Sequence, residues 1–120
     1  MLETIEGFPE HVVAVRGVGL VTADDYRAVL GPAIAAATAG GRRARLLVEL
    51  GDAFEGYDTG AMLADAGLGA TNLRSFERIA IVTDAGWIRR SIQLFGGFIP
   101  ADIRVFATAS SAAAREWVRA

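Results

Sequence analysis

Three short apolar runs limit what this chain can fold into, because segments with helical spacing separate them. The runs are Leu46–Leu50, Ile79–Val82 and Ile103–Phe106. The first two are mostly apolar without strict alternation, which is typical of buried strands, and the third is predicted to be the last strand. Strands that alternate with helices require right-handed crossovers. The pattern therefore predicts a mainly parallel sheet with helices on both of its faces.

The N-terminal segment predicts one antiparallel pair in the same sheet. Leu2–Glu6 alternates apolar and polar residues, as expected of a short edge strand. Gly7–Glu10 is predicted to be a turn, and Val12–Val15 a second strand that ends near Gly17. Two strands joined by so short a connection are expected to pair as a hairpin.

The first helix has a clear start and a predicted interruption. Thr22 is a good N-cap, and Asp24 and Asp25 follow it in the first turn, where acidic side chains suit the positive helix end. Pro32 lies inside the apolar stripe that follows. Because proline removes one backbone hydrogen bond, we expect a kink or a broken helix near Gly31.

The remaining segments complete the expected order of elements. Gly51–Asp58 is predicted to be a loop, and Thr59–Leu68 a helix weakened by its glycines. A third helix begins at Trp87, and Ser110 or Ser111 caps a fourth. The predicted fold class is α/β in the order β-β-α-β-α-β-α-β-α: a mostly parallel sheet with an antiparallel N-terminal strand and helices covering it.

Composition narrows the class of protein further. A chain of 120 residues is long enough to bury a core, and we expect residues 1–120 to form one domain. The net charge of -2 shows no basic footprint for nucleic acid. The N-terminus does not resemble a signal peptide, and no apolar run reaches the roughly 18 residues of a spanning helix. We therefore expect a cytoplasmic protein without stable membrane insertion.

Few residues suited to catalysis or metal binding are present. The chain has no cysteine, and His11 is its only histidine, so we expect no metal site and no cofactor. Acidic residues do gather where the parallel strands should end: Glu49, Asp52, Glu55, Asp58 and Asp84. They could act as acids or bases or bind a cation, but helix capping and solvation explain them more simply. We expect no enzyme, with a carboxylate site as the lower-ranked alternative.

Several segments together resemble the SpoIIAA-like family of small bacterial proteins. They are Leu20–Tyr26 with Pro32 downstream, Leu46–Leu50 followed by Phe54–Tyr57, Phe76–Val82 with the helix from Trp87, Arg104–Phe106, and Ala114 with Trp117. The resemblance covers nearly the whole chain. It implies a STAS-type fold, like that of anti-sigma-factor antagonists, and a layout similar to the CRAL-TRIO group. The subgroup that the chain most resembles has no assigned activity.

The resemblance also identifies a switch-equivalent position. In the antagonists, a serine at the start of the second helix is phosphorylated within Asp-Ser-Ser/Thr-Gly. Here Tyr57 stands at the aspartate of that motif, Asp58 at the phosphoserine, Thr59 at the second hydroxyl and Gly60 at the glycine. Asp58 cannot accept a phosphate from a serine kinase and carries a permanent negative charge. Capping of the helix by Asp58 or Thr59 is the simpler interpretation.

Large apolar residues at the end of the third helix are the other candidate site. Trp87 and Phe95 are predicted to share the inward helix face with Ile88, Ser91 and Ile92. Phe98 and Ile99, on a glycine-containing loop, are harder to bury. Exposed together with Met62 and Leu63, they would form an apolar patch, which usually marks an interface or ligand groove.

Two functions follow from such a patch. The first is a protein-interaction module that binds an unidentified protein or forms a homodimer. The second is a carrier of a small apolar or lipid-like ligand, in a pocket near the third helix.

Overall fold

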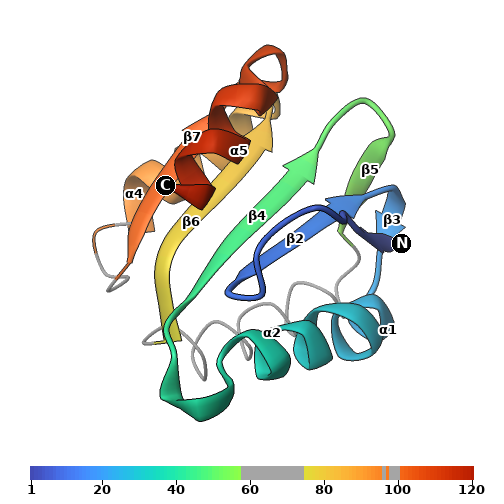
Figure 1. Cartoon of the computed structure of the whole chain (residues 1–120). Helices are drawn as coiled ribbons and strands as arrows, with labels where there is room; N and C mark the ends of the chain where they lie inside the picture. The colour runs from blue at the N-terminus through green and yellow to red at the C-terminus, as the bar shows by residue number, and fades with distance from the viewer. Residues whose placement is uncertain (58–74, 96, 98–100) are drawn as a thin grey trace.

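The computed structural model describes residues 1–57, 75–95, 97 and 101–120, with the backbone alone at Phe95. Within these residues, five strands form the main sheet in the order β1-β2-β4-β6-β7 (Figure 1). The strands are β1 (Leu2–Thr4), β2 (Val12–Gly17), β4 (Ala44–Leu50), β6 (Phe76–Thr83) and β7 (Asp102–Phe106).

The predicted pairing of these strands is confirmed. β1 lies antiparallel to β2, with Thr4 opposite Val15, and every other pair in this sheet is parallel. The edge strand is shorter than expected, since β1 ends at Thr4. Leu47 on the central strand stands opposite Ala14 and Ala80, and all three are buried. The middle of the sheet is therefore covered on this face, as its apolar sequence predicts.

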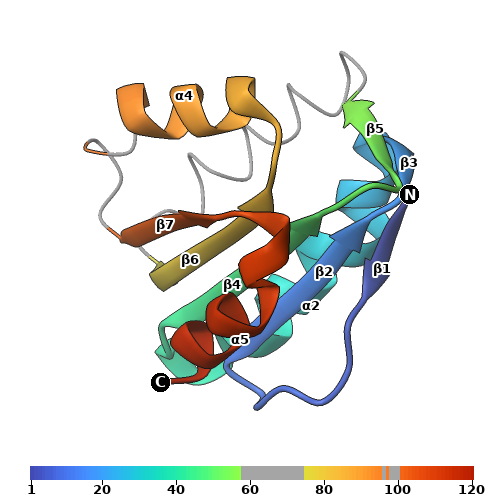
Figure 2. The same cartoon turned by 90° about the horizontal axis from the view of Figure 1, so that it is seen from above.

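Helices cover both faces of the sheet (Figure 2). One face packs against a helical stretch made of α1 (Ala23–Asp25), a π-helical segment (Tyr26–Leu30) and α2 (Gly31–Ala37). The other face packs against α5 (Ser111–Arg119), where Ala114 and Val118 are fully buried. The fold is thus a mixed α/β arrangement with a mostly parallel sheet.

The expected interruption near Pro32 takes the form of a π turn. The N–H of Gly31 donates to the carbonyl of Tyr26, five residues earlier, and Pro32 opens α2 at its first turn. A proline in a regular α-helix would lack one N–H donor, and its ring would clash with the carbonyl four residues earlier. The wider turn before Pro32 relaxes this conflict, as π-bulges within helices do.

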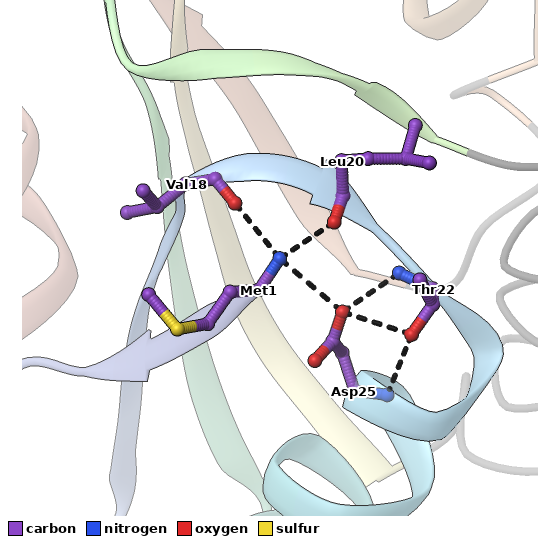
Figure 3. A network of polar contacts seen from close by, with 5 residues as sticks. All are labelled: Met1, Val18, Leu20, Thr22 and Asp25. Carbon is purple, nitrogen blue, oxygen red and sulfur yellow. Dashed lines mark hydrogen bonds and ion pairs between the residues drawn. The ribbon is translucent and has the colours of Figure 1, made fainter.

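The start of α1 is fixed by a polar network that includes the chain's amino group (Figure 3). Thr22 and Asp25 form a reciprocal capping box, with the Thr22 N–H 2.8 Å from Asp25 Oδ2. The amino group of Met1 donates to the carbonyls of Val18 and Leu20, at 2.8 and 2.6 Å, and lies 3.3 Å from Asp25 Oδ2. The network joins β1, α1 and the segment between β2 and α1.

A second, smaller sheet was not predicted. β3 (Gly19–Val21) pairs in parallel with β5 (Phe54–Tyr57), so the expectation of a loop across Gly51–Asp58 is wrong at residues 54–57. The two strands have three and four residues, and Gly56 adopts a positive φ of 141°. Short glycine-containing strands lack the sustained alternation by which a strand is recognised in sequence.

Arginine side chains hold the end of α5 against the sheet. Arg45 donates to the carbonyl of Val118 at 3.1 Å, and Arg78 to that of Trp117 at 2.9 Å. These carbonyls belong to the last helical turn, which has no intrahelical donors for them. At the other end, Ser110 occupies the N-cap position as predicted, but within the described residues its side chain makes no capping hydrogen bond.

One further helix, α4 (Gly86–Phe95), follows β6 and contacts β7. In the described parts of the chain, no helix is long and apolar enough to cross a bilayer.

Candidate functional site

An aromatic row extends from the core to the surface near the end of β6. Tyr57, the last residue of β5, stands at its centre. Its ring stacks on that of Tyr26 at 6.2 Å between centroids and meets Phe54 edge-on at 5.1 Å. On the other side it meets the indole of Trp87 edge-on at 6.4 Å, with an interplanar angle of 86°. These are the separations and orientations that aromatic pairs prefer.

Exposure rises along this row. Tyr26 is 4% exposed, Tyr57 is half-buried and Trp87 is 47% exposed. The sequence interpretation placed Trp87 with Ile88 on one inward helix face, and only Ile88, at 7% exposure, is buried there. Helical periodicity identifies the apolar face of a helix, but not which residues at the border of that face are covered by the rest of the protein.

A hydrogen-bonded turn joins the end of β6 to the start of α4. The hydroxyl of the buried Thr83, the last residue of β6, accepts a hydrogen bond from the N–H of Ala85 at 3.1 Å. α4 then begins at Gly86, so that Trp87 lies in its first turn. Within the helix, the hydroxyl of Ser91 donates to the carbonyl of Trp87 at 2.8 Å.

A second exposed apolar side chain lies on the same side of α4. Leu94 is 68% exposed and stands two helical turns after Trp87, at position i+7, so the two side chains share a face. The exposed Arg90 lies between them along this face. α4 thus has an inward side, marked by Ile88, and an outer apolar flank formed by Trp87 and Leu94.

Most of the predicted site lies outside the described residues. This applies to Asp58, Thr59 and Gly60 of the switch-equivalent position, and to Met62, Leu63, Phe98 and Ile99 of the apolar patch. For Phe95 the structure describes the helical backbone alone. Trp87 is the predicted site residue whose side chain is placed. Its neighbour Tyr57 ends β5 immediately before Asp58, so the switch-equivalent segment follows directly after the aromatic row.

Two of the acidic residues predicted at the carboxyl end of the strands, Glu49 and Asp84, have structural partners. Glu49 forms an ion pair with Arg115 of α5 at 2.7 Å. Asp84 accepts a hydrogen bond from the N–H of Thr108 at 2.9 Å, and this bond lowers the pKa of Asp84. A lowered pKa keeps the carboxylate ionised, which is the opposite of what a general acid needs. Within the described residues, no group of histidine and acidic side chains is arranged to hold a metal ion.

A cavity of about 380 Å³ lies between the β1–β2 connection and α2. Its walls are mainly apolar and include Ile5, Phe8, Val13, Ala33 and Ala36. The short side chains of the alanines leave room beside β2. Among the described side chains, none from α4 lines this cavity, so it is distinct from the pocket that the sequence predicts near the third helix.

Comparison with known proteins agrees with the observed architecture. A profile described as SpoIIAA-like matches residues 12–119. The chain belongs to the SpoIIAA-like family. This SpoIIAA-like chain is also similar to the crystal structure of an uncharacterized protein of the DUF3478 family, with a SpoIIAA-like fold, from Shewanella loihica PV-4. The TM-score is 0.73 at 20% sequence identity, over 98% of this chain and 92% of that one. A comparison with curated proteins gave no match.

Membership of the SpoIIAA-like family confirms the fold that the sequence pattern implied. The sequence does not indicate the aromatic row, although it singles out Tyr57 and Trp87 separately. Tyr26 and Tyr57 are far apart in sequence, and they meet because β3 and β5 pair. No local pattern signals this contact. The one usable signal is the placement of Phe54 and Tyr57 directly before the switch-equivalent segment.

Proposed function

We propose that this SpoIIAA-like chain is a non-enzymatic binding module that acts through protein–protein contact, as a homodimer or with a second protein. The contact surface that we propose is centred on Trp87. The observation that carries the proposal is the half-exposed indole of Trp87, held edge-on against Tyr57. Tryptophan and tyrosine are enriched among the residues that dominate the free energy of binding at interfaces.

Preorganisation of the indole supports this function. A side chain that is already packed on one edge loses less conformational freedom on binding than a free one. Tyr57 provides this support, and Tyr57 is in turn packed between Phe54 and the buried Tyr26. The indole is thus held in place by packed aromatic neighbours while part of it stays exposed, as the contact residues of binding surfaces often are.

The surroundings of the carboxylates favour binding over catalysis. Glu49 is engaged by Arg115, and Asp84 by the N–H of Thr108. An acid or base at an active site usually has a pKa shifted toward neutrality by burial. Asp84 is exposed and its pKa is lowered. Its interaction with Thr108 serves instead to join the segment after β6 to the segment after β7.

Sedimentation velocity over a wide range of protein concentration tests the proposal. We expect self-association in the purified protein, and we expect Trp87→Ala to weaken it by about 30-fold or more, the effect of removing a dominant interface residue. Leu20→Ala is the matched control, because Leu20 is similarly exposed at 51% but lies on β3. A strict monomer excludes the homodimer. A Trp87→Ala variant that associates like the control shows that the surface is elsewhere.

Carriage of a small apolar ligand is the second candidate, and the cavity of about 380 Å³ beside α2 supports it. Its volume lies within the range of small-molecule sites, roughly 300 to 1,000 Å³. Native mass spectrometry of freshly purified protein would detect a co-purified ligand as an added mass. We expect Ala33→Phe, which places a phenyl ring in the cavity, to remove that mass, whereas Trp87→Ala should retain it. Protein without any added mass would count against the carrier function.

A further inference from the structure

We infer that the outer flank of α4 docks on a membrane surface that bears anionic lipid head groups. The inference goes beyond the proposed protein contact, because it concerns a lipid surface and involves Arg89, Arg90 and Leu94 in addition to Trp87. It rests on three observations: the charge of the α4 segment, the exposure of its apolar flank, and the position of the helix in the molecule.

The charge of the α4 segment differs from that of the whole chain. Acidic residues outnumber basic ones overall, 14 to 12, yet the sequence from Ala85 to Ala101 contains no Asp or Glu and includes Arg89 and Arg90. Both arginines are exposed, and no carboxylate among the described residues forms an ion pair with either. A basic amphipathic helix of this kind is typical of membrane-surface segments.

Among the described residues, the carboxylate of Asp84 interacts with Arg89. Arg89 contributes to the lowering of the Asp84 pKa, after the hydrogen bonds from Thr108. Asp84 is thus hydrogen-bonded to the segment after β7, and its negative charge partly offsets the positive charge of Arg89 but not that of Arg90. Arg90 follows Arg89 by about 100° around the helix and lies nearer the apolar flank, where its positive charge is available to a lipid phosphate.

The apolar flank has the composition of an interfacial helix. Trp87 is 47% exposed and Leu94 is 68% exposed, on one side of α4 and two turns apart. Tryptophan is enriched at membrane–water interfaces because its ring is apolar and its N–H is polar. An arginine beside such a flank can bury its stem with the apolar residues and keep its charge at the head groups. Trp87, Arg90 and Leu94 have this arrangement.

The position of α4 leaves this flank accessible. Ile88 is buried, so the inward side of the helix is already used for packing, and α4 contacts the outermost strand β7. Figure 2 shows α4 at the margin of the molecule, well separated from α2 and α5. A helix at the margin of the molecule can meet a planar lipid surface without a matching groove in a partner. The helix would lie at the interface, as amphipathic helices do, and would not cross the bilayer.

Vesicle flotation tests the inference directly. The unaltered protein is mixed with vesicles of phosphatidylcholine alone, or of phosphatidylcholine with phosphatidylglycerol, at low and high salt. We expect binding to the anionic vesicles at low salt and loss of binding at high salt or on neutral vesicles, because screening weakens attraction between exposed charges. Equal binding to both vesicle types, or none at low salt, overturns the inference.

Two variants identify the face. The double variant Arg89→Gln with Arg90→Gln should reduce partition to anionic vesicles by about fivefold or more, since a basic residue near such a surface contributes about a factor of five and Arg90 is the one beside the flank. The matched control, Arg16→Gln with Arg27→Gln, changes net charge equally at exposed positions on β2 and the π-helical segment. Equal losses in both variants would show an effect of net charge alone and would refute a role for α4.

The two proposals can fail separately. Self-association is measured without lipid, and vesicle binding is measured below the concentration at which the protein associates. If the protein binds soluble poly-glutamate but not anionic vesicles, the flank recognises an acidic protein segment, and the lipid inference is wrong. If it binds vesicles as a monomer, with a blue shift of tryptophan emission that Trp87→Phe removes, the inference holds even where the homodimer does not.

Discussion

The ring of Tyr57 meets the indole of Trp87 edge-on, with 6.4 Å between centroids. The contact joins the end of β5 to the first turn of α4. One ring is half-buried among aromatic neighbours, and the other is 47% exposed. Tyr57 therefore supports the fold, whereas Trp87 faces solvent. The two should differ in how much their removal lowers the free energy of unfolding.

We expect Tyr57→Ala and Trp87→Ala to differ clearly in stability. Tyr57 packs against Tyr26, Phe54 and Trp87, so its truncation should lower the free energy of unfolding by about 2 to 4 kcal/mol. Trp87→Ala removes one edge-on contact and only the buried half of the indole, and should lower it by about 1 kcal/mol. Urea unfolding followed by circular dichroism measures both. Equal losses would show that Trp87 belongs to the core.

Gly17 and Gly86 differ in the space that surrounds them, and only Gly17 lies where the two sheets approach each other. A Cβ on Gly17 would lie 2.7 Å from Leu50 Cδ2 and 3.2 Å from Phe54 Cδ1, so Gly17→Ala should destabilise the protein by about 1 to 3 kcal/mol. Gly86 has open space around its Cα and stands at the first position of α4. Gly86→Ala should therefore raise stability by about 0.4 to 1 kcal/mol. Thermal unfolding of the two variants should move in opposite directions.

How much of this could be read from the sequence depends on the range of each interaction. The hairpin, the parallel order and the Thr22 cap were predictable, because apolar periodicity and capping residues act over a few positions. The pairing of β3 with β5 was not, since two strands of three and four residues find each other across the intervening β4. The direction of Trp87 was also out of reach, because it depends on what covers each edge of α4.

The arginines at the end of α5 offer a third test. The side chain of Arg45 is 13% exposed, lies 3.0 Å from Glu77 and donates to the carbonyl of Val118. Arg45→Ala removes both interactions and leaves a partly buried carbonyl without its donor, so we expect a loss of about 2 to 3 kcal/mol. Arg27→Ala is the control, because the Arg27–Asp24 pair is exposed and should contribute less than about 1 kcal/mol. Similar losses of stability in both variants would show that the hydrogen bond from Arg45 to the end of α5 does not stabilise the fold.

Arg45 also lowers the pKa of Glu77 through their hydrogen bond. Glu77→Gln tests the contribution of this ion pair at one defined site. The neutral amide still accepts a hydrogen bond from Arg45 but does not titrate. We expect Glu77→Gln to lose less stability than Arg45→Ala, because the bond from Arg45 to the carbonyl of Val118 remains. The comparison separates the helix-end contact from the ion pair, and chemical unfolding at neutral pH measures it.

The capping box gives a prediction for acidic pH. The pKa of Asp25 is lowered, first by the hydrogen bond from the N–H of Thr22 and then by the Thr22 hydroxyl and the amino group of Met1. A group whose pKa is depressed in the folded state stabilises the fold above its unfolded pKa, here about 3.8, and this contribution is lost as the pH falls through the lowered folded value. Asp25→Asn should thus cost about 1 kcal/mol at neutral pH and weaken the fall in stability below about pH 4. Asp24→Asn, at an exposed position outside the box, should leave that fall unchanged. Unfolding curves at several pH values provide the measurement, and identical acid profiles for Asp25→Asn and the unaltered protein would show that the ionised carboxylate does not stabilise the start of α1.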